Sequence, residues 1–285
     1  METVLPDPEP DPEPDPGHET HERDLAFAHE LADLAATITL PAFGGRLAVT
    51  LKADRTPVTE LDPATERALR ERTASAFPDD AFLGEEDGRS GHGDRVWVVD
   101  PIDGTKNFAD GVPLWSTLVA LVVDGQPVLG IIDVPTLGDR YAARRGAGAT
   151  RNGEPIRVST TTALDQALLV HSGLEEWIRD GRLADLARVA DRARRTRGLT
   201  DAWGHALVAQ GSADVLVDHD PCGEWDYAAG KIIVEEAGGR MTTLNGGALH
   251  AGCDLLVTNG SLHDQVRKLL GGSAPSEALG GRNQE

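Results

Sequence analysis

Three features are scarce in this chain of 285 residues: cysteine, aromatic residues and long apolar runs. The two cysteines, Cys222 and Cys253, lack C-x-x-C spacing and predict no disulfide framework, which fits a reducing compartment. Aromatic residues make up only 4% of the chain, so aliphatic side chains and alanine must build the core. No apolar run approaches the ~18 residues that a membrane helix needs, and the N-terminal residues lack the pattern of a secretory signal. We therefore expect a cytoplasmic protein with no membrane partner.

Positive charge is also scarce. The net charge is −20, and residues 1–22 contribute eight acids with no lysine or arginine, so the remaining chain still carries −12. Such a surface repels nucleic acids and anionic membranes, and neither is an expected partner. An acidic protein that handles an anionic substrate needs local positive charge, which a bound metal ion would supply.

The order of predicted elements divides the chain into four parts. Residues 1–19 alternate proline with acids and predict a disordered tail, and the polar, glycine-rich residues 273–285 predict a second one. Residues 20–160 predict two helices followed by a largely antiparallel sheet, and residues 161–272 predict alternating strands and helices. Two adjoining layered subdomains of the α+β type, with a cleft between them, are the expected packing.

Periodicity and turn signals place the individual elements. In the first subdomain we expect helices over 25–38 and 62–77, with Asp62 as the N-cap before Pro63, and strands over 47–51, 97–100, 116–123, 128–134, 140–144 and 156–159. In the second we expect strands over 168–171, 214–217, 241–243 and 255–257, and helices over 182–194, 202–210, 225–237 and 261–270.

Four carboxylates occupy conspicuous positions in this pattern. Glu85 follows an apolar pair and a glycine, Asp100 ends an apolar strand, Asp103 lies in the following turn, and Asp226 begins a helix with a small, apolar body. Each has an ordinary interpretation alone, since turns favour such residues and an acid in a first helical turn complements the helix dipole. Together they suggest a Mg²⁺ site, because Mg²⁺ is held by a few carboxylates, water and substrate phosphate.

The residues that follow Asp103 suggest the substrate of such a site. Gly104 and Thr105 offer backbone N–H groups, Thr105 adds a hydroxyl, and the N-terminus of a following helix binds phosphate. Two metal ions ~3.5–4 Å apart can activate a water and stabilise a leaving oxygen. Competing motifs are missing, because the sequence contains no P-loop, no G-x-S-x-G elbow and no H-E-x-x-H pair. The combination points to phosphoester hydrolysis.

Three motifs in order resemble the inositol monophosphatase family: Gly84-Glu85-Glu86, the run from Trp97 through Asp100-Pro-Ile-Asp103-Gly-Thr105 to Phe108, and Trp225-Asp226-Tyr-Ala-Ala-Gly230. The resemblance covers about residues 20–271. It implies a Mg²⁺-dependent, lithium-sensitive phosphoric monoester hydrolase with a layered α/β/α/β/α fold. Because relatives commonly dimerise, it also implies a homodimer.

The resemblance assigns roles to the matching residues. Two or three Mg²⁺ ions would be held by Glu85, Asp100, the Ile102 carbonyl, Asp103 and Asp226. Glu85 and Thr105 would orient the attacking water, and the N–H groups of Gly104 and Thr105 would hold the phosphate. Where many inositol phosphatases have an aspartate before the V-T of V-T-x-x-D, this chain has Thr56. Glu85 would then carry more of the base role, with Thr56 as a relay.

Other residues resemble the bacterial histidinol-phosphate phosphatases, the histidine-biosynthesis branch of the family: the stretch Thr56–Asp62, Lys106, Gly111–Trp115 and Thr200–Trp203. This likeness implies hydrolysis of L-histidinol phosphate by metal-activated water. The cationic amine of the histidinol group would pair with Asp201, or with Asp218 or Asp220.

Three of the residues assigned to substrate binding could instead have a purely structural role. Asp201 could instead cap a helix, Trp203 could belong to the core instead of lining the substrate, and Lys106 could be a solvated turn residue instead of steering the phosphate. Two alternative functions also remain: hydrolysis of inositol-1-phosphate or another sugar phosphate, and non-enzymatic binding of metal or phosphate by a regulator.

Overall fold

The structure, a computed structural model, describes residues 16–45, 49–51, 57–199 and 201–271. Helix α1 (Pro16–Thr39) includes residues 16–19, which were expected to belong to the N-terminal tail. The rest of that tail, the C-terminal tail and Thr56 lie outside the described residues. Within the described residues, no helix is long and apolar enough to cross a membrane.

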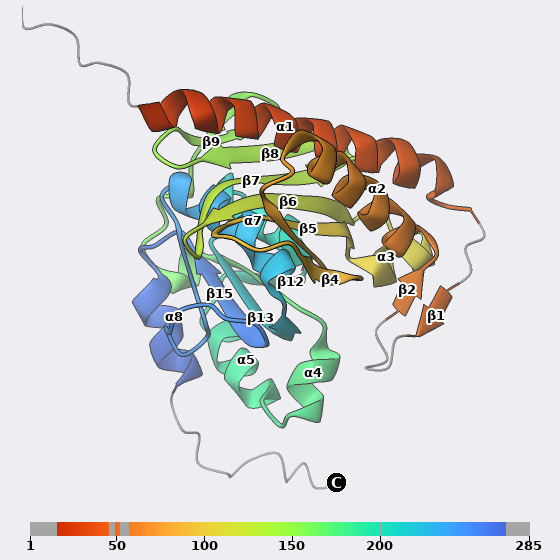
Figure 1. Ribbon diagram of the computed structural model, residues 1–285. Coiled ribbons are helices and arrows are strands. Elements are labelled where there is room, and N and C mark those ends of the chain that lie inside the picture. Colours follow the sequence, from red (N-terminus) through yellow and green to blue (C-terminus); the bar gives the residue numbers. More distant parts are fainter. Residues whose placement is uncertain (1–15, 46–48, 52–56, 200, 272–285) are drawn as a thin grey trace, which may run out of the picture.

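An eight-stranded sheet dominates the first half of the chain (Figure 1). Its spatial order is β10-β9-β8-β7-β6-β5-β3-β4, and every neighbouring pair is antiparallel except β3 and β5. The strands are β3 (Ala81–Gly84), β4 (Gly88–Ser90), β5 (Arg95–Asp103), β6 (Ser116–Val123), β7 (Gln126–Val134), β8 (Asp139–Arg144), β9 (Gly148–Arg151) and β10 (Glu154–Ile156). A separate ribbon pairs β1 (Val49–Leu51) with β2 (Pro57–Thr59).

A five-stranded sheet organises the second half. Its order is β12-β11-β13-β15-β14, formed by β11 (Leu168–His171), β12 (Arg195–Gly198), β13 (Val215–Cys222), β14 (Arg240–Thr242) and β15 (Cys253–Thr258). The other helices are α2 (Leu61–Ala76), α3 (Thr105–Asp110), α4 (Leu174–Arg179), α5 (Leu183–Ala190), α6 (Asp201–Ala209), α7 (Glu224–Glu236) and α8 (His263–Leu270), with short 3₁₀ turns at Leu40–Ala42 and Leu164–Gln166.

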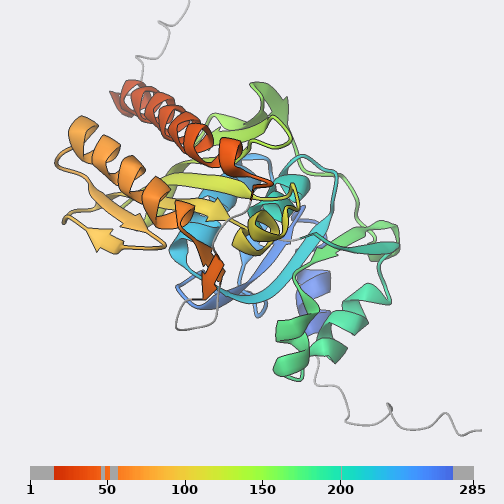
Figure 2. The same cartoon turned by 90° about the vertical axis from the view of Figure 1, so that its right-hand side faces the viewer.

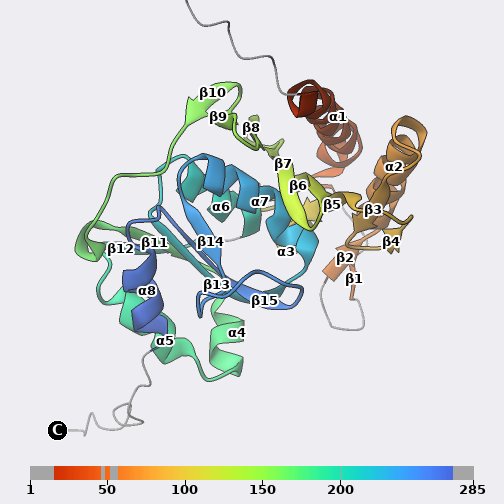
Figure 3. The same cartoon turned by 60° about the vertical axis from the view of Figure 1, so that its left-hand side comes forward.

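The helices form three layers around the two sheets. Helices α1 and α2 cover the outer face of the large sheet, α6 and α7 lie between the sheets, and α4, α5 and α8 cover the far face of the small sheet (Figures 2 and 3). The central core therefore joins residues of both sheets, such as Leu118 and Leu216, through the apolar faces of α6 and α7. This arrangement confirms the layered α/β/α/β/α fold.

Several expected elements were wrong in their extent. The predicted helix over 182–194 is the shorter α5, and the polar strand β12 follows it, pairing in parallel with β11. Helix α4 was missed because its six residues are too short for a periodic pattern. The predicted strand over 156–159 is instead β10, and Asn152-Gly153 joins β9 to β10. Helix α2 begins at Leu61 with Glu60 at its N-cap, so Asp62 is not the cap.

The buried histidine of α6 makes the fold sensitive to acid. His205 is 2% exposed, and within the described part of the chain neither ring nitrogen has a hydrogen-bond partner. Burial lowers its pKa from 6.5 to about 4. Because the folded pKa lies below the unfolded one, the neutral imidazole contributes stability that is present above pH 6.5 and lost as the pH falls toward 4.

We therefore expect the free energy of unfolding to lose roughly 3 kcal/mol through this one group between pH 7 and pH 4. The variant His205→Leu removes the titrating ring and its unpaired nitrogens, so its stability should fall less over this range. Urea unfolding of both proteins at pH 7, 5.5 and 4.5 measures the difference. Parallel stability curves for the two proteins would show that His205 is not the responsible group.

Candidate active site

A β-bulge brings the first two acids of the site onto one face of the sheet. In the pairing of β5 with β6, Asp100 lies opposite Leu118 and Asp103 lies opposite Ser116. The segment of β5 between these pairs is therefore one residue longer than the matching segment of β6. Side chains three residues apart point to opposite faces of a regular strand, and one extra residue restores a common face. The prediction that Asp103 lies in a turn beyond the strand was wrong, because β5 continues to Asp103.

The third acid comes from the middle helical layer. Asp226 lies in the first turn of α7, where its carboxylate accepts a hydrogen bond from the Gly223 N–H. Asp100, Asp103 and Asp226 each offer a carboxylate oxygen, and these three oxygens lie within 4.8 Å of one another. Helix α7 packs against β5, β6, β7 and β8, so the sheet itself holds this acid against the other two.

The parallel pairing of β3 with β5 places Glu85 at the same edge. Gly84 lies opposite Val99 in this register, so the next residues on the two strands are Glu85 and Asp100. The carboxylate of Glu85 is close enough that its charge raises the pKa of Asp100, Asp103 and Asp226. The four acids singled out from the sequence therefore meet at one place.

The electrostatics of this cluster favour a cation. Burial raises the pKa of Asp100 well above 3.8, and the charges of Glu85, Asp103 and Asp226 add to the shift. Burial also raises the pKa of Asp103 to about 6, although hydrogen bonds from the Ser116 hydroxyl and the Ala202 N–H oppose this shift. Buried carboxylates in mutual repulsion are costly unless a positive charge compensates them.

A further acid, Asp62, contacts the threonine of the site. The Thr105 hydroxyl lies 3.2 Å from Asp62 Oδ1 and 3.0 Å from the Ile102 carbonyl oxygen, so its single proton has two possible acceptors. Asp62 is fully buried, and its other oxygen accepts hydrogen bonds from the N–H and hydroxyl of Thr59. Asp62 was predicted only as a helix cap, and Thr56, which was predicted as a relay, lies outside the described residues. The aspartate of the V-T-x-x-D stretch itself is the signal that would have identified this pair.

The acids expected to contact the substrate lie beside the predicted phosphate turn. Asp201 has a left-handed backbone (φ 58°), and its Oδ2 lies 3.4 Å from Asn107 Nδ2 and 3.1 Å from where a Cβ of Gly104 would stand. A non-glycine residue in this conformation is uncommon outside functional or constrained sites. Burial raises the pKa of Asp201, the charges of Asp103, Asp218 and Asp220 raise it further, and Lys106 opposes them.

The other residues expected to contact the substrate differ in how deeply they are buried. Asp218 is buried, and its Oδ1 accepts a hydrogen bond from the Asp220 N–H at 3.0 Å. Burial raises the pKa of Asp220 to about 8, with further contributions from Asp218 and Glu176. Trp203 is half-buried and packs against the central core, while Lys106 is exposed. Glu176, from the missed helix α4, had no sequence signal.

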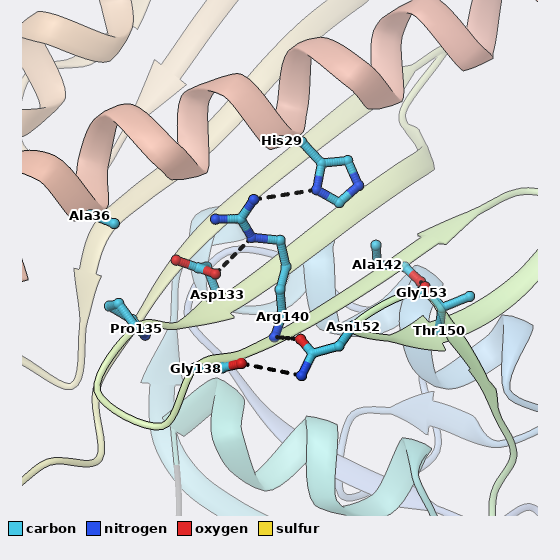
Figure 4. A pocket seen from close by; sticks show the side chains of 10 residues that line it. All are labelled: His29, Ala36, Asp133, Pro135, Gly138, Arg140, Ala142, Thr150, Asn152 and Gly153. Atoms are coloured by element: carbon cyan, nitrogen blue, oxygen red, sulfur yellow. Dashed lines mark hydrogen bonds and ion pairs between the residues drawn. The ribbon is translucent and has the colours of Figure 1, made fainter.

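A separate depression of about 450 Å³ lies between α1 and the strands β7 and β8 (Figure 4). Arg140 crosses it and pairs with Asp133 and Asp33, both at 2.7 Å, and lies 3.5 Å from His29 Nδ1. None of the predicted site residues lines it. The guanidinium of Arg140 is already paired with the carboxylates of Asp33 and Asp133, and none of the four acids of the cluster lines this depression.

Comparison with known proteins identifies the family. The model of the inositol monophosphatase family matches residues 21–273. The chain belongs to this family. It is 41% identical over 250 residues to a histidinol-phosphatase of Mycobacterium tuberculosis, covering 85% of this chain and 96% of the relative. It is likewise 41% identical over 254 residues to a histidinol-phosphatase of Streptomyces coelicolor, covering 85% and 95%.

Solved structures of inositol monophosphatases share the fold. The enzyme from Anabaena superposes with a TM-score of 0.78 at 30% identity, covering 88% of this chain and 96% of the other. The enzyme from Zymomonas mobilis superposes with a TM-score of 0.78 at 33% identity, covering 88% and 98%. The chain is thus a phosphatase of a metal-dependent family, and its acidic cluster could bind metal.

Proposed function

We propose that this enzyme hydrolyses L-histidinol phosphate to L-histidinol and phosphate, as a step of histidine biosynthesis. The histidinol-phosphatases cited above support the substrate. The observation that carries the proposal is the group of acids Asp201, Asp218 and Asp220, whose charges act on one another beside the phosphate turn. Carboxylates are charge-matched partners for the protonated amine of histidinol, whereas the ring hydroxyls of an inositol phosphate carry no positive charge.

We further propose Mg²⁺ as the metal, bound as two or three ions. The residues fit this cation, because three carboxylate oxygens within 4.8 Å of one another form a hard-oxygen donor set with uncompensated negative charge. Asp100, Asp103, Asp226, Glu85 and the Ile102 carbonyl would hold the ions. When bound, they would lower the pKa of a coordinated water and offset the charge of the phosphate.

The protein's own groups would orient the reactants. If the Thr105 hydroxyl donates its proton to Asp62, its oxygen is left to accept a hydrogen bond from the attacking water. Glu85 would share this water as a base. The N–H groups of Gly104 and Thr105 begin α3, where a helix has no internal acceptors for its first donors, and we propose that they hold the phosphate. The alcohol would then leave in line, without a phosphoenzyme.

A substrate panel tests the proposal. We expect the highest kcat/KM with L-histidinol phosphate among this ester, myo-inositol-1-phosphate and fructose-1,6-bisphosphate, each with Mg²⁺, and we expect Li⁺ to inhibit. The substrate assignment would be abandoned if histidinol phosphate were the poorest of the three. Metal binding without phosphate release from any ester would indicate a regulator. We also propose a homodimer located in the cytoplasm, in keeping with the family resemblance.

A further inference from the structure

A buried acid outside the motifs of the family resemblance lies directly behind the turn that carries Glu85. Glu66, in the middle of α2, is fully buried. Its Oε2 accepts a hydrogen bond from the Glu86 N–H at 2.6 Å, and its Oε1 accepts one from the Asp87 N–H at 3.1 Å. The two N–H groups immediately after Glu85 are therefore both bound to one carboxylate.

We propose that Glu66 is a positioning residue that fixes the turn of residues 85–87, so that Glu85 faces Asp100, Asp103 and Asp226. The inference rests on the proposed function, in which Glu85 holds metal and orients the attacking water. Glu66 touches none of the reacting groups itself. It acts through the backbone of the turn, which it ties to the long helix α2.

Arg70 completes the arrangement one helical turn later. Its Nη2 lies 2.6 Å from Glu66 Oε1 and also donates to the Gly88 carbonyl at 2.9 Å. Its Nη1 donates to the Ser90 hydroxyl, and its guanidinium lies 4.5 Å from the centre of the Phe82 ring. The pair Glu66–Arg70 thus binds the turn and both strands, β3 and β4, that lead into and out of it.

The glycine of the G-E-E motif is explained by the same carboxylate. A Cβ added to Gly84 would lie 2.2 Å from Glu66 Cδ and 2.4 Å from both carboxylate oxygens, which is closer than atoms can approach. The backbone of Gly84 has no left-handed conformation that would demand glycine. We therefore attribute the glycine to the space that Glu66 needs, which links the two residues independently of the hydrogen bonds.

The variant Glu66→Gln tests the inference with little change of shape. The carboxylate faces three donors, the two N–H groups and Arg70, whereas an amide has only one acceptor oxygen, so at least one donor loses its partner. Removing a residue that orients a metal ligand typically costs 10–100-fold in metal affinity. We expect the dissociation constant for Mg²⁺ to rise by about this factor, while KM for the substrate at saturating Mg²⁺ stays within about threefold.

Two measurements besides activity distinguish a positioning role of Glu66 from a general loss of protein stability. Calorimetric titration of the metal-free protein with Mg²⁺ measures affinity directly, and hydrogen exchange reports on the Glu86 and Asp87 amides, which should exchange faster in Glu66→Gln. The matched control is Arg72→Gln on the same helix, because Arg72 pairs with Glu30 at 2.5 Å and lies over the Phe27 ring, both on α1 and away from the turn of residues 85–87. The control should leave both measurements unchanged.

A second variant, Gly84→Ala, crowds the same carboxylate from the opposite side. We expect it to weaken Mg²⁺ binding in the same way, and the double variant with Glu66→Gln to cost less than the product of the two single effects. Wild-type Mg²⁺ affinity in Gly84→Ala and in a folded Glu66→Gln would overturn the inference. If Glu66→Gln failed to fold, the affinity of Gly84→Ala alone would decide. Weakened Mg²⁺ binding in a protein that hydrolyses no phosphate ester would retain the inference and reject the proposed function.

Discussion

Asp100→Asn is expected to lower kcat on the best substrate by roughly 10³-fold or more while the protein stays folded. Asp100 is 2% exposed and shares a cluster with Asp103 and Asp226, so its loss removes a central donor for a metal ion. A factor of 10³ corresponds to about 4 kcal/mol of lost transition-state stabilisation, which is within the several kcal/mol that a metal supplies. The measurement is kcat at saturating Mg²⁺ with L-histidinol phosphate.

The same substitution should have the opposite effect on the stability of the metal-free protein. The pKa of Asp100 is raised well above that of an unfolded chain, so its ionised form destabilises the folded state once the pH exceeds the unfolded pKa near 3.9. Asparagine carries no charge and avoids this penalty. In EDTA at pH 7.5 we expect a higher Tm for Asp100→Asn than for the wild type, and the difference should disappear as the pH approaches 4.

Controls for both effects are available in the same region. Asp110 is an exposed acid at the end of α3, so Asp110→Asn should change neither kcat nor the metal-free Tm appreciably. With Mg²⁺ present, the order of the Tm values should reverse, because only the wild type gains the full free energy of metal binding. If Asp100→Asn kept more than a tenth of the wild-type kcat, Asp100 could not be an essential metal ligand.

Gly130→Val is expected to lower the Tm by roughly 6–12 °C, at about 2–4 °C per kcal/mol. Gly130 lies in β7 beneath α7, and a Cβ there would stand 2.7 Å from Ile232 Cγ2 and 2.8 Å from both the Cα and the carbonyl oxygen of Ala229. Backbone atoms of a packed helix cannot move aside as a flexible side chain can. Overpacking of this kind costs about 3 kcal/mol.

This strain should also reach the active site. Helix α7 carries Asp226 in its first turn, so displacing the helix from the sheet would move that acid away from Asp100 and Asp103. We expect the Mg²⁺ concentration for half-maximal activity to rise together with the fall in Tm. The control is Gly198→Val in β12, where the first added carbon would lie 3.5 Å from His171 Cε1, an ordinary contact. A wild-type Tm for Gly130→Val would show that the helix has room to shift.

Local patterns in the sequence were sufficient to find the acids of the site and the fold class. Asp100 ends a predicted strand and Asp103 follows it in a predicted turn, while Glu85 comes after an apolar pair and a glycine and Asp226 begins a predicted helix. Acids in such positions can be recognised from the local sequence alone, since an ionised group beside an apolar stretch needs a compensating partner. The three motifs that contain these acids also identify the family, and family membership was confirmed over residues 21–273.

Partners that come from a distant segment were not visible in the same way. Asp62 was predicted only as a helix cap, but its Oδ1 lies 3.2 Å from the hydroxyl of Thr105, which is 43 residues further along the chain. Glu66 resembled any acid on an amphipathic helix, although it is fully buried against a turn 20 residues later. The short elements α4 and β12 were missed because their stability comes from packing and parallel pairing, not from local periodicity.

By itself, therefore, the sequence determined which residue types could hold a metal and a phosphate, and roughly which strands and helices carry them. Only the tertiary structure decided how those residues meet. The bulge between Asp100 and Asp103 turns the two side chains to one face, the parallel register of β3 and β5 sets Glu85 beside them, and the packing of α7 on the sheet brings in Asp226. Register and packing depend on pairings between distant segments. The residue pattern of one strand does not specify which residues of another strand will lie opposite it.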